Sequence, residues 1–243
     1  MKPVPGFAMD EYKMALENGE ISLQGQFLPG SNYTFLVHVE HQGHEWPAVY
    51  KPIRGEQPLW DFPQASLAGR EVAAYIVSEA LGFKFVPFTT LRSGPMGPGS
   101  LQQFIDYNPN NHYFSFSEAN RQRLRPVVLF DLLVNNADRK GSHIIFQKRT
   151  RRLFIIDHGL CFHPEDKLRT VIWDFAGEHF SAELIASLVS FRKSLPKRLN
   201  PVLRNYLSAE EVAALQERLE RLLKEPFFPL PPNDRRAFPY PPL

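Results

Sequence analysis

Four ionisable side chains occur along the sequence in an order that suits the transfer of a phosphoryl group. Lys51 ends a short apolar run and could hold phosphate oxygens, and Glu71 could pair with it. Asp138 follows the apolar segment VVLFDLLV, in the polar stretch VNNADRKGSH, where an acid could orient or deprotonate a hydroxyl. Asp157 closes the apolar run LFIID, and a carboxylate at such a strand end suits Mg²⁺. In this order, the four match the parts needed for phosphoryl transfer.

Each of these residues taken alone also has a purely structural interpretation. Lys51 could mark the exposed end of a strand, Glu71 could be a solvated residue on a helix border, and the polar stretch could be an ordinary loop. Asp131, inside the apolar segment, is expected to be buried and to hold the backbone of the loop that contains Asp138. Cys161, in the apolar run GLCF, is expected to be a buried small residue and not a nucleophile.

The first third of the chain is predicted to form the strands that carry Lys51. Alternation of apolar and polar residues predicts three antiparallel strands, in the runs ISLQGQF, YTFLVHVE and WPAVYK, with LPGSN as the first turn. A helix is predicted over residues 66–81, with Ser66 as its N-cap and Gly82 at its end. Two more strands, FTTLR and SLQQFID, are predicted around the turn SGPMGPG. Three strands are therefore expected before the first helix.

The later part of the chain is predicted to be mainly helical. A helical pattern over EANRQRLRPVVLFDLLVN is interrupted by Pro126, which should kink or restart the helix. An apolar hairpin, HIIFQ and RLFIID, follows, and then the helices SAELIASLVSFRKSL and SAEEVAALQERLERLLKE, the second with a capping box. These patterns predict one α+β domain over residues 1–243, with an antiparallel-sheet N-lobe (about 15–106), a small helical C-lobe (about 107–225) and a proline-rich tail (226–243) that lies extended along the body.

Composition limits the classes of partner. The chain has 243 residues and a net charge of +2, which argues against nucleic acid or a membrane surface as the main partner. It has no apolar run long enough for a transmembrane segment, and the N-terminus MKPVPGFAMDEYK does not resemble a signal peptide. A single cysteine excludes an internal disulfide framework. A cytoplasmic protein is therefore expected, with an oligomeric state that the sequence does not define.

Several segments resemble one known family. The runs AVYKP, GREVAAY, VPFTTL, GSLQQFI, VNNADR and FIIDHGLCF follow one another between about residues 48 and 162. They resemble the phosphatidylinositol 3-/4-kinase superfamily, above all type II phosphatidylinositol 4-kinases, and also a group of related bacterial proteins. The type II kinases have an NTDR loop and an IDNGLAF strand at the last two positions. This resemblance implies a bilobal, protein-kinase-like fold that binds ATP with Mg²⁺ or Mn²⁺.

The resemblance also implies a role for each matching residue. Lys51 would contact the ATP phosphates with Glu71 as its partner, and Val49 would cover the adenine face. Asp138 would be the catalytic acid that orients or deprotonates the acceptor hydroxyl, Arg139 would neutralise phosphate, and Asp157 would be the main metal ligand. The hinge whose backbone meets adenine would consist of Gln103, Phe104 and Ile105.

The sequence departs from this family at several points. His143 stands where the family has an asparagine as second metal ligand, and imidazole suits Mn²⁺ or other transition metals better than Mg²⁺. The loop LPGSN has one glycine and is a poor phosphate-covering loop, and the lipid-binding part of a lipid kinase is not evident.

Three functional interpretations remain open. The first is an ATP-dependent kinase whose hydroxyl-bearing substrate is a protein, a small alcohol or an inositol-type lipid. The second is a pseudokinase that acts as a nucleotide-binding regulatory module. The third is a metal-dependent hydrolase, whose ligands would come from Asp138, His143, Asp157, His158 and His163.

Overall fold

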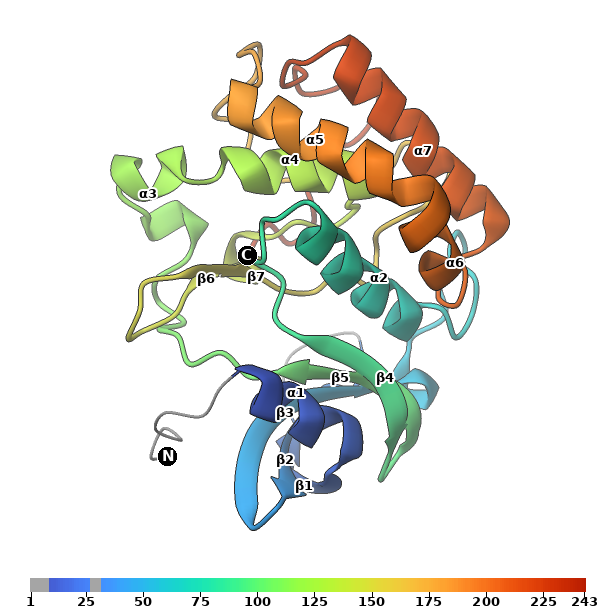
Figure 1. The fold of residues 1–243 in the computed structure, drawn as a ribbon. Helices are drawn as coiled ribbons and strands as arrows, with labels where there is room; N and C mark the ends of the chain where they lie inside the picture. The colour runs from blue at the N-terminus through green and yellow to red at the C-terminus, as the bar shows by residue number, and fades with distance from the viewer. Residues whose placement is uncertain (1–8, 27–31) are drawn as a thin grey trace.

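The computed structural model describes residues 9–26 and 32–243, which form a sheet at one end and a group of helices at the other (Figure 1). The sheet has five antiparallel strands in the order β1-β2-β3-β5-β4. The strands are β1 (Glu20–Gln26), β2 (Phe35–His41), β3 (His44–Pro52), β4 (Thr89–Gly94) and β5 (Gly97–Gln103). Helix α2 (Leu67–Ala80) lies between the sheet and the helices at the other end of the molecule, so the expected two-lobed arrangement is confirmed.

Two predictions concern residues outside the described part of the chain. They are the absence of a signal peptide, which concerns residues 1–8, and the turn LPGSN, of which residues 28–31 are not described. The weakness of LPGSN as a phosphate-covering loop therefore stays a prediction.

The other turn, expected to span SGPMGPG, is tighter than predicted. Strands β4 and β5 stay paired as far as Gly94 and Gly97, where a φ of 95° at Gly97 favours glycine.

The expectation that strands precede the first helix is wrong, because helix α1 (Met9–Asn18) comes before β1. Ala15 and Leu16 are its two fully buried apolar residues, and they pack in one cluster with Val37 and Trp46 of the sheet. So narrow an apolar stripe gives a weak periodic signal, and the contacts that stabilise α1 come from strands later in the chain.

Alternation along β3 divides its residues between two faces of the sheet. Trp46, Ala48 and Tyr50 are buried in the cluster that includes α1. Val49 and Lys51 alternate with them and are half-buried on the opposite face, which turns toward the C-terminal lobe. The strand therefore presents Lys51 between the lobes, as predicted.

Helix α2 begins and ends where the sequence predicts, but Ser66 does not cap it. Ser66 has helical backbone angles, and its hydroxyl donates to Pro63 O at 2.6 Å. The carboxylate of Glu56 instead accepts hydrogen bonds from the backbone amides of Leu67 and Ala68, at 3.3 and 2.9 Å. An acid from the preceding loop thus satisfies the free amides of the first turn.

The C-terminal lobe contains the helices and the short hairpin that the sequence predicts, together with shorter turns that it does not. Pro126 lies in the first turn of a new helix, so the predicted restart is confirmed, and Ser208 and Glu211 form the predicted capping box. The main elements are α3 (Glu118–Gln122), α4 (Arg125–Val134), β6 (Ile144–Phe146), β7 (Leu153–Ile155), α5 (Ala182–Ser194), α6 (Asn200–Leu203) and α7 (Ala209–Lys224).

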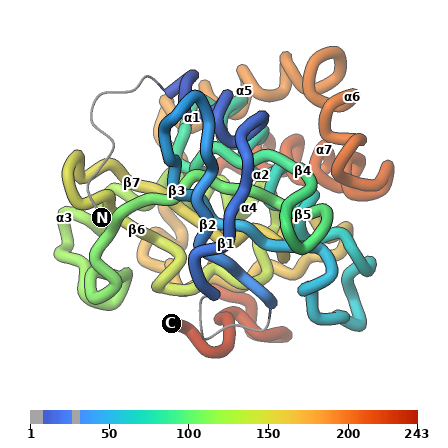
Figure 2. The backbone as a smooth tube through the Cα atoms, turned by 90° about the horizontal axis from the view of Figure 1, so that it is seen from below, coloured from blue at the N-terminus to red at the C-terminus, as the bar shows by residue number. Residues whose placement is uncertain are grey.

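The chain beyond α7 runs along the body of the protein, as predicted for the proline-rich tail. Phe228 is buried against the rings of Phe175 and Phe180. The chain then continues past Leu168 and Thr170 and ends beside Gly141, in the segment that precedes β6. Its end (C) lies between the sheet and the upper helices in Figure 1 and at the lower edge of the molecule in Figure 2. None of the helices in the described part of the chain has the length and apolar character needed to cross a membrane.

Candidate active site

Lys51, Glu71 and Asp157 meet between the lobes, as their order in the sequence predicts. Lys51 forms ion pairs with Glu71 and with Asp157, the second with Nζ 2.9 Å from Oδ1. Burial alone would lower the pKa of Lys51, but the two carboxylates outweigh it and raise the pKa. Burial would likewise raise the pKa of Glu71, but Lys51 and His158 lower it to about 2. The lysine is therefore a fixed cation, held by groups from α2 and from the segment after β7.

Helix α2, which carries Glu71, is itself fixed to the C-terminal lobe. Arg70, fully buried, forms an ion pair with Glu211 of α7 and donates to the backbone oxygen of Cys161. Glu211 thus both caps α7 and pairs with α2. The sequence predicted that Glu211 caps α7. It did not predict the ion pair, because Arg70 and Glu211 lie 141 positions apart in the chain.

Asp157 and His143 are neighbours at the mouth of the site. Asp157 adopts a left-handed backbone with φ of 64°, which an aspartate seldom adopts, and its side chain is 48% exposed. Burial would raise the pKa of this carboxyl, but Lys51 and His143 outweigh burial and lower it. His143 Nε2 lies 3.3 Å from Asp157 Oδ2. Burial lowers the pKa of His143 to about 4, so its imidazole is neutral at pH 7, as a metal ligand must be.

Asp138 lies on the loop after α4 with its carboxyl partly shielded. Asn135 ends α4 in a left-handed conformation, and the side chain of Asn136 accepts a hydrogen bond from Asp138 N at 2.9 Å. Burial raises the pKa of Asp138 to about 6, and nearby Asp157 adds to the rise, while Lys140, with Nζ 3.5 Å from Oδ2, opposes it. A carboxyl group with such a pKa can accept a proton near neutral pH.

The raised pKa of Asp138 predicts a pH dependence of stability that an amide would remove. A carboxyl whose folded pKa of about 6 exceeds the usual 3.8 favours the folded state below pH 3.8, and that contribution is lost as the pH rises through 6. We therefore expect Asp138→Asn to gain stability relative to the wild type as the pH rises. Denaturant unfolding at about pH 4 and about pH 7 measures the change. An equal difference at both pH values would contradict the raised pKa.

The expectation that Arg139 neutralises phosphate is wrong. Its side chain is fully buried and forms an ion pair with Asp131. Nε and Nη2 donate to the two carboxylate oxygens of Asp131, each at 2.9 Å, and Nη1 donates to Ile156 O at 3.0 Å. Asp131 is buried as predicted, but it bonds the side chains of Arg139 and Asn136 instead of the loop's backbone amides. Together, Arg139 and Asp131 hold the loop from inside the lobe.

His158 is the residue of this site whose role the sequence did not indicate. Its backbone amide donates to Glu71 Oε2 at 3.0 Å, and its Nε2 lies 3.0 Å from Nη2 of Arg139. Burial lowers its pKa, so the ring is neutral and Nε2 can accept from the arginine. His158 therefore joins the buried pair beneath the loop to the Glu71–Lys51 pair above it.

The predicted hinge begins at Gln103, the last residue of β5, and joins the lobes. Gln103 N donates to Phe88 O at 2.8 Å and Phe104 N donates to Pro47 O at 3.3 Å. Ile105 is buried in a cluster with Ile145 and Phe154 of the β6–β7 hairpin. The hinge thus passes between the sheet and the hairpin. Its contact with adenine, like that of Val49, stays a prediction.

The residues at the mouth of the site fit a divalent cation that is held mainly by phosphates. Among the described residues there is no group of three or more His, Cys, Asp or Glu side chains placed to hold a metal. Mg²⁺ and similar ions need only one or two protein ligands when phosphate oxygens and water complete the shell. Asp157 and His143 meet that requirement.

The two other histidines of the hydrolase interpretation, His158 and His163, do not join His143 as metal ligands. The ring of His163 packs on Phe62, and its Nε2 lies 2.9 Å from Asp61 O. His158 is occupied by Arg139 as described. Cys161 is fully buried, as expected, and burial raises the pKa of its thiol well above the usual value, so it is not a nucleophile.

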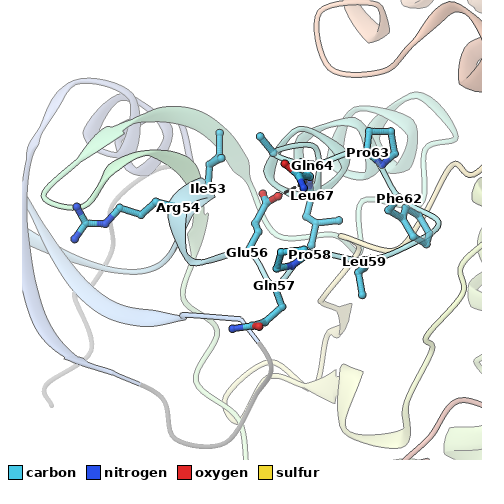
Figure 3. A pocket seen from close by; sticks show the side chains of 11 residues that line it. Ile53, Arg54, Glu56, Gln57, Pro58, Leu59, Phe62, Pro63, Gln64 and Leu67 are labelled. Atoms are coloured by element: carbon cyan, nitrogen blue, oxygen red, sulfur yellow. Dashed lines mark hydrogen bonds between the residues drawn. The ribbon is translucent and has the colours of Figure 1, made fainter.

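Two cavities lie apart from this cleft. The first, about 270 Å³, is lined by 11 residues of the segment between Ile53 and Leu67, in front of α2 (Figure 3). The second, about 340 Å³, lies between α7 and the tail. Neither is lined by a residue of the predicted site.

The sequence matches a family profile and one curated protein over most of its length. The profile described as phosphatidylinositol 3- and 4-kinase matches residues 65–219, which include Glu71, Asp138 and Asp157. Protein Rv2133c of Mycobacterium tuberculosis is 35% identical over an alignment that covers 97% of this chain and 98% of that protein.

Solved structures with the same fold are more distant in sequence. The Helicobacter pylori proinflammatory kinase CtkA superposes with a TM-score of 0.54 at 13% identity, covering 86% of this chain and 93% of that chain. The hydra Fam20 structure superposes with a TM-score of 0.52 at 13% identity, covering 87% and 86%. These likenesses confirm the bilobal kinase-like α+β fold.

Proposed function

Because the chain belongs to the phosphatidylinositol 3- and 4-kinase family, we propose that it is an ATP-dependent phosphotransferase that transfers the γ-phosphoryl group to a hydroxyl acceptor. The observation that carries this proposal is the meeting of Lys51, Glu71 and Asp157 beside the loop of Asp138. The acceptor classes that fit are a protein, a small alcohol and an inositol-type lipid.

Each residue would act through its charge and position. Lys51, fixed by Glu71, would bind phosphate oxygens of ATP and neutralise their charge. Asp157 and His143 would hold a divalent cation, which when bound neutralises the charge that develops on the phosphates. Asp138 would accept the proton of the acceptor hydroxyl while the oxygen bonds to the γ-phosphorus and the bond to the β-phosphate oxygen breaks, leaving ADP.

A pseudokinase that binds nucleotide without transfer is the second candidate. The observation that favours it is His143 beside Asp157, where the family has an asparagine. ADP formation from ATP distinguishes the two, since both bind nucleotide and only the kinase converts it. A protein that binds ATP with metal and forms no ADP with any acceptor class would be the pseudokinase.

Thermal unfolding with ATP and metal tests the nucleotide site. A ligand present at about 100 times its Kd adds about 2.7 kcal/mol to the stability of the native state, roughly 5–10 °C for a protein of this size. We expect this increase in Tm for the wild type with ATP and Mn²⁺, and we expect its metal-dependent part to vanish in Asp157→Ala. Glu220→Ala, which removes an exposed carboxylate on α7, is the matched control and should shift as the wild type does. An equal shift in Asp157→Ala would refute the metal assignment.

His143 predicts a metal preference. A neutral imidazole favours Mn²⁺ over Mg²⁺, whereas an amide oxygen suits Mg²⁺. We expect the wild type to bind ATP more tightly with Mn²⁺ than with Mg²⁺. We expect His143→Asn to reduce this ratio by about tenfold, the low end of the loss in metal affinity when a residue that supports a metal ligand is replaced. Titration calorimetry with ATP and each metal measures both ratios. The same ratio in both proteins would mean that His143 does not touch the cation.

A further inference from the structure

The last residues of the chain lie against the loop that carries Asp138. Gly141 N donates to Pro242 O at 2.8 Å, and Gly141 follows Asp138 by three positions. Leu243 is so close to Gly141 that a Cβ added to the glycine would lie 3.5 Å from its Cδ1. In Figure 1 the end of the chain lies at a height between the sheet and the upper helices.

Segment 169–171 connects the tail to the loop that carries Asp138 through backbone hydrogen bonds. Arg139 N donates to Arg169 O at 3.0 Å, and Val171 N donates back to Arg139 O at 3.1 Å. Thr170 N, on the other edge of that short segment, donates to Ala237 O at 3.1 Å. Segment 169–171 therefore pairs with the catalytic loop on one edge and with the tail on the other.

The tail is fixed at Arg235, before its first contact with segment 169–171. Its backbone accepts hydrogen bonds there and at the loop through the carbonyls of Ala237 and Pro242. Arg235 pairs with Asp166 at 2.9 Å and donates to Leu168 O at 2.7 Å. These two contacts fix the position of the chain just before Ala237. Ala237 is buried, whereas Tyr240 is 80% exposed. Proline has no amide hydrogen, so a proline-rich chain can supply carbonyls without leaving amides unpaired.

We propose that the amides of Gly141 and Thr170 form a docking strip for a polypeptide, that this is where a protein acceptor binds, and that residues 237–243 occupy it within the same chain. This inference rests on the proposed function and narrows its acceptor to a protein. The two donors take main-chain carbonyls that lie five residues apart in a tail that bends at residues 238, 240 and 241. Main-chain carbonyls are supplied by any polypeptide, whatever its side chains. A small alcohol or a lipid head group needs no such strip.

While residues 237–243 occupy the strip, the full chain transfers phosphate more slowly to a protein acceptor from solution. A tethered segment competes at millimolar effective concentration with any acceptor from solution. Removing residues 237–243 is therefore expected to raise transfer to an added peptide by about tenfold or more, since two backbone hydrogen bonds no longer oppose its binding. Transfer forms the bond between the peptide's hydroxyl oxygen and the γ-phosphorus, as in the proposed function.

Hydrogen exchange tests the docking without requiring activity. We expect the amides of Gly141 and Thr170 to exchange at least about tenfold faster in the chain that ends at Arg236, and to be protected again by an added peptide of residues 233–243. Exchange that does not respond to truncation or to the peptide would overturn the docking strip. The Tm shift with ATP and Mn²⁺, measured on the same truncated chain, shows separately whether the nucleotide site is intact.

A series of peptides tests the acceptor. The peptides span residues 233–243 with Tyr240→Phe and with one serine moved through positions 238–243, and mass spectrometry reads phosphate incorporation by the truncated chain. We expect incorporation at one or two adjacent positions, those that reach Asp138. Peptides that protect the two amides but accept no phosphate would overturn the polypeptide acceptor and leave only an internal clamp. No transfer together with no ATP-dependent Tm shift would mean that the proposed function has failed.

Arg235→Ala provides a second variant if the truncated chain does not fold. It removes the ion pair with Asp166 while leaving residues 237–243 in place, so both amides should exchange faster and transfer to the best serine peptide should rise. Arg192→Ala, which removes a surface ion pair with Glu220 on the α5–α7 face, is the matched control and should change neither. Equal behaviour of the two variants would overturn the occupation of the strip.

Discussion

Asp138→Asn is expected to lower phosphoryl transfer by about 10²- to 10⁴-fold while the protein stays folded and binds nucleotide. The raised pKa of about 6 lets this carboxylate accept a proton near neutral pH, whereas an amide of the same shape cannot. Asp138 contacts Lys140 and the side chain of Asn136 and carries no buried ion pair. The initial rate of ADP formation with a saturating acceptor measures the loss.

The Tm shift with ATP and Mn²⁺ separates loss of chemistry from loss of binding. Asp138→Asn should give the shift of the wild type, because Lys51 and Asp157 are unchanged. Glu220→Gln, the same change from carboxylate to amide on the surface of α7, should retain both the shift and the rate. If Asp138→Asn turns over ATP as fast as the wild type, Asp138 is not the catalytic acid.

The fold was largely predictable because its signals are local. The alternation of β3 places Lys51, Gly82 ends α2, and the capping box starts α7 whatever lies elsewhere. Helix α1 was missed because few of its residues are buried and its partners are strands further along the chain. The cap of α2 was misassigned because Glu56, which performs it, lies outside the helix in a loop with no regular pattern.

The site was predictable for side chains that point into the cleft and not for those that support them. Lys51, Glu71 and Asp157 were brought together by the order of their motifs. Arg139 is adjacent to Asp138, and adjacency does not say which of two neighbours turns inward. Its partner Asp131 was visible as an acid in an apolar helix, and a buried acid requires a cation; that requirement was the missed signal.

Once Arg139 is placed inward, the supports of the site form a single connected network. The Asp131–Arg139 pair contacts His158, and the amide of His158 binds Glu71, which holds Lys51. The loop of Asp138 and the lysine of the sheet therefore share buried supports, although they belong to different lobes. A substitution in the Asp131–Arg139 pair is therefore expected to change the position of both Asp138 and Lys51.

Asp131→Ala should produce the largest loss of stability. It leaves the fully buried guanidinium of Arg139 without its carboxylate, and breaking a buried pair in this way costs about 3–5 kcal/mol. Native domains are stable by only about 5–15 kcal/mol, so the variant should lose a large share of its stability, with Tm lowered on the order of 10 °C. Denaturant unfolding measures the free energy directly.

Removing both charges should restore most of this stability without restoring transfer. In Asp131→Leu with Arg139→Met no buried charge is left unpaired, and apolar replacements of a buried pair are often neutral or stabilising. The loop would still lose the bonds from Asp131 to Asn136 and from Arg139 to Ile156, so ADP formation should stay low in the double variant. Glu220→Ala, which breaks the exposed pair with Arg192, should cost less than about 1 kcal/mol. If Asp131→Ala is as stable as that surface variant, the buried pair does not hold the loop; if the stable double variant is fully active, the pair contributes to folding alone.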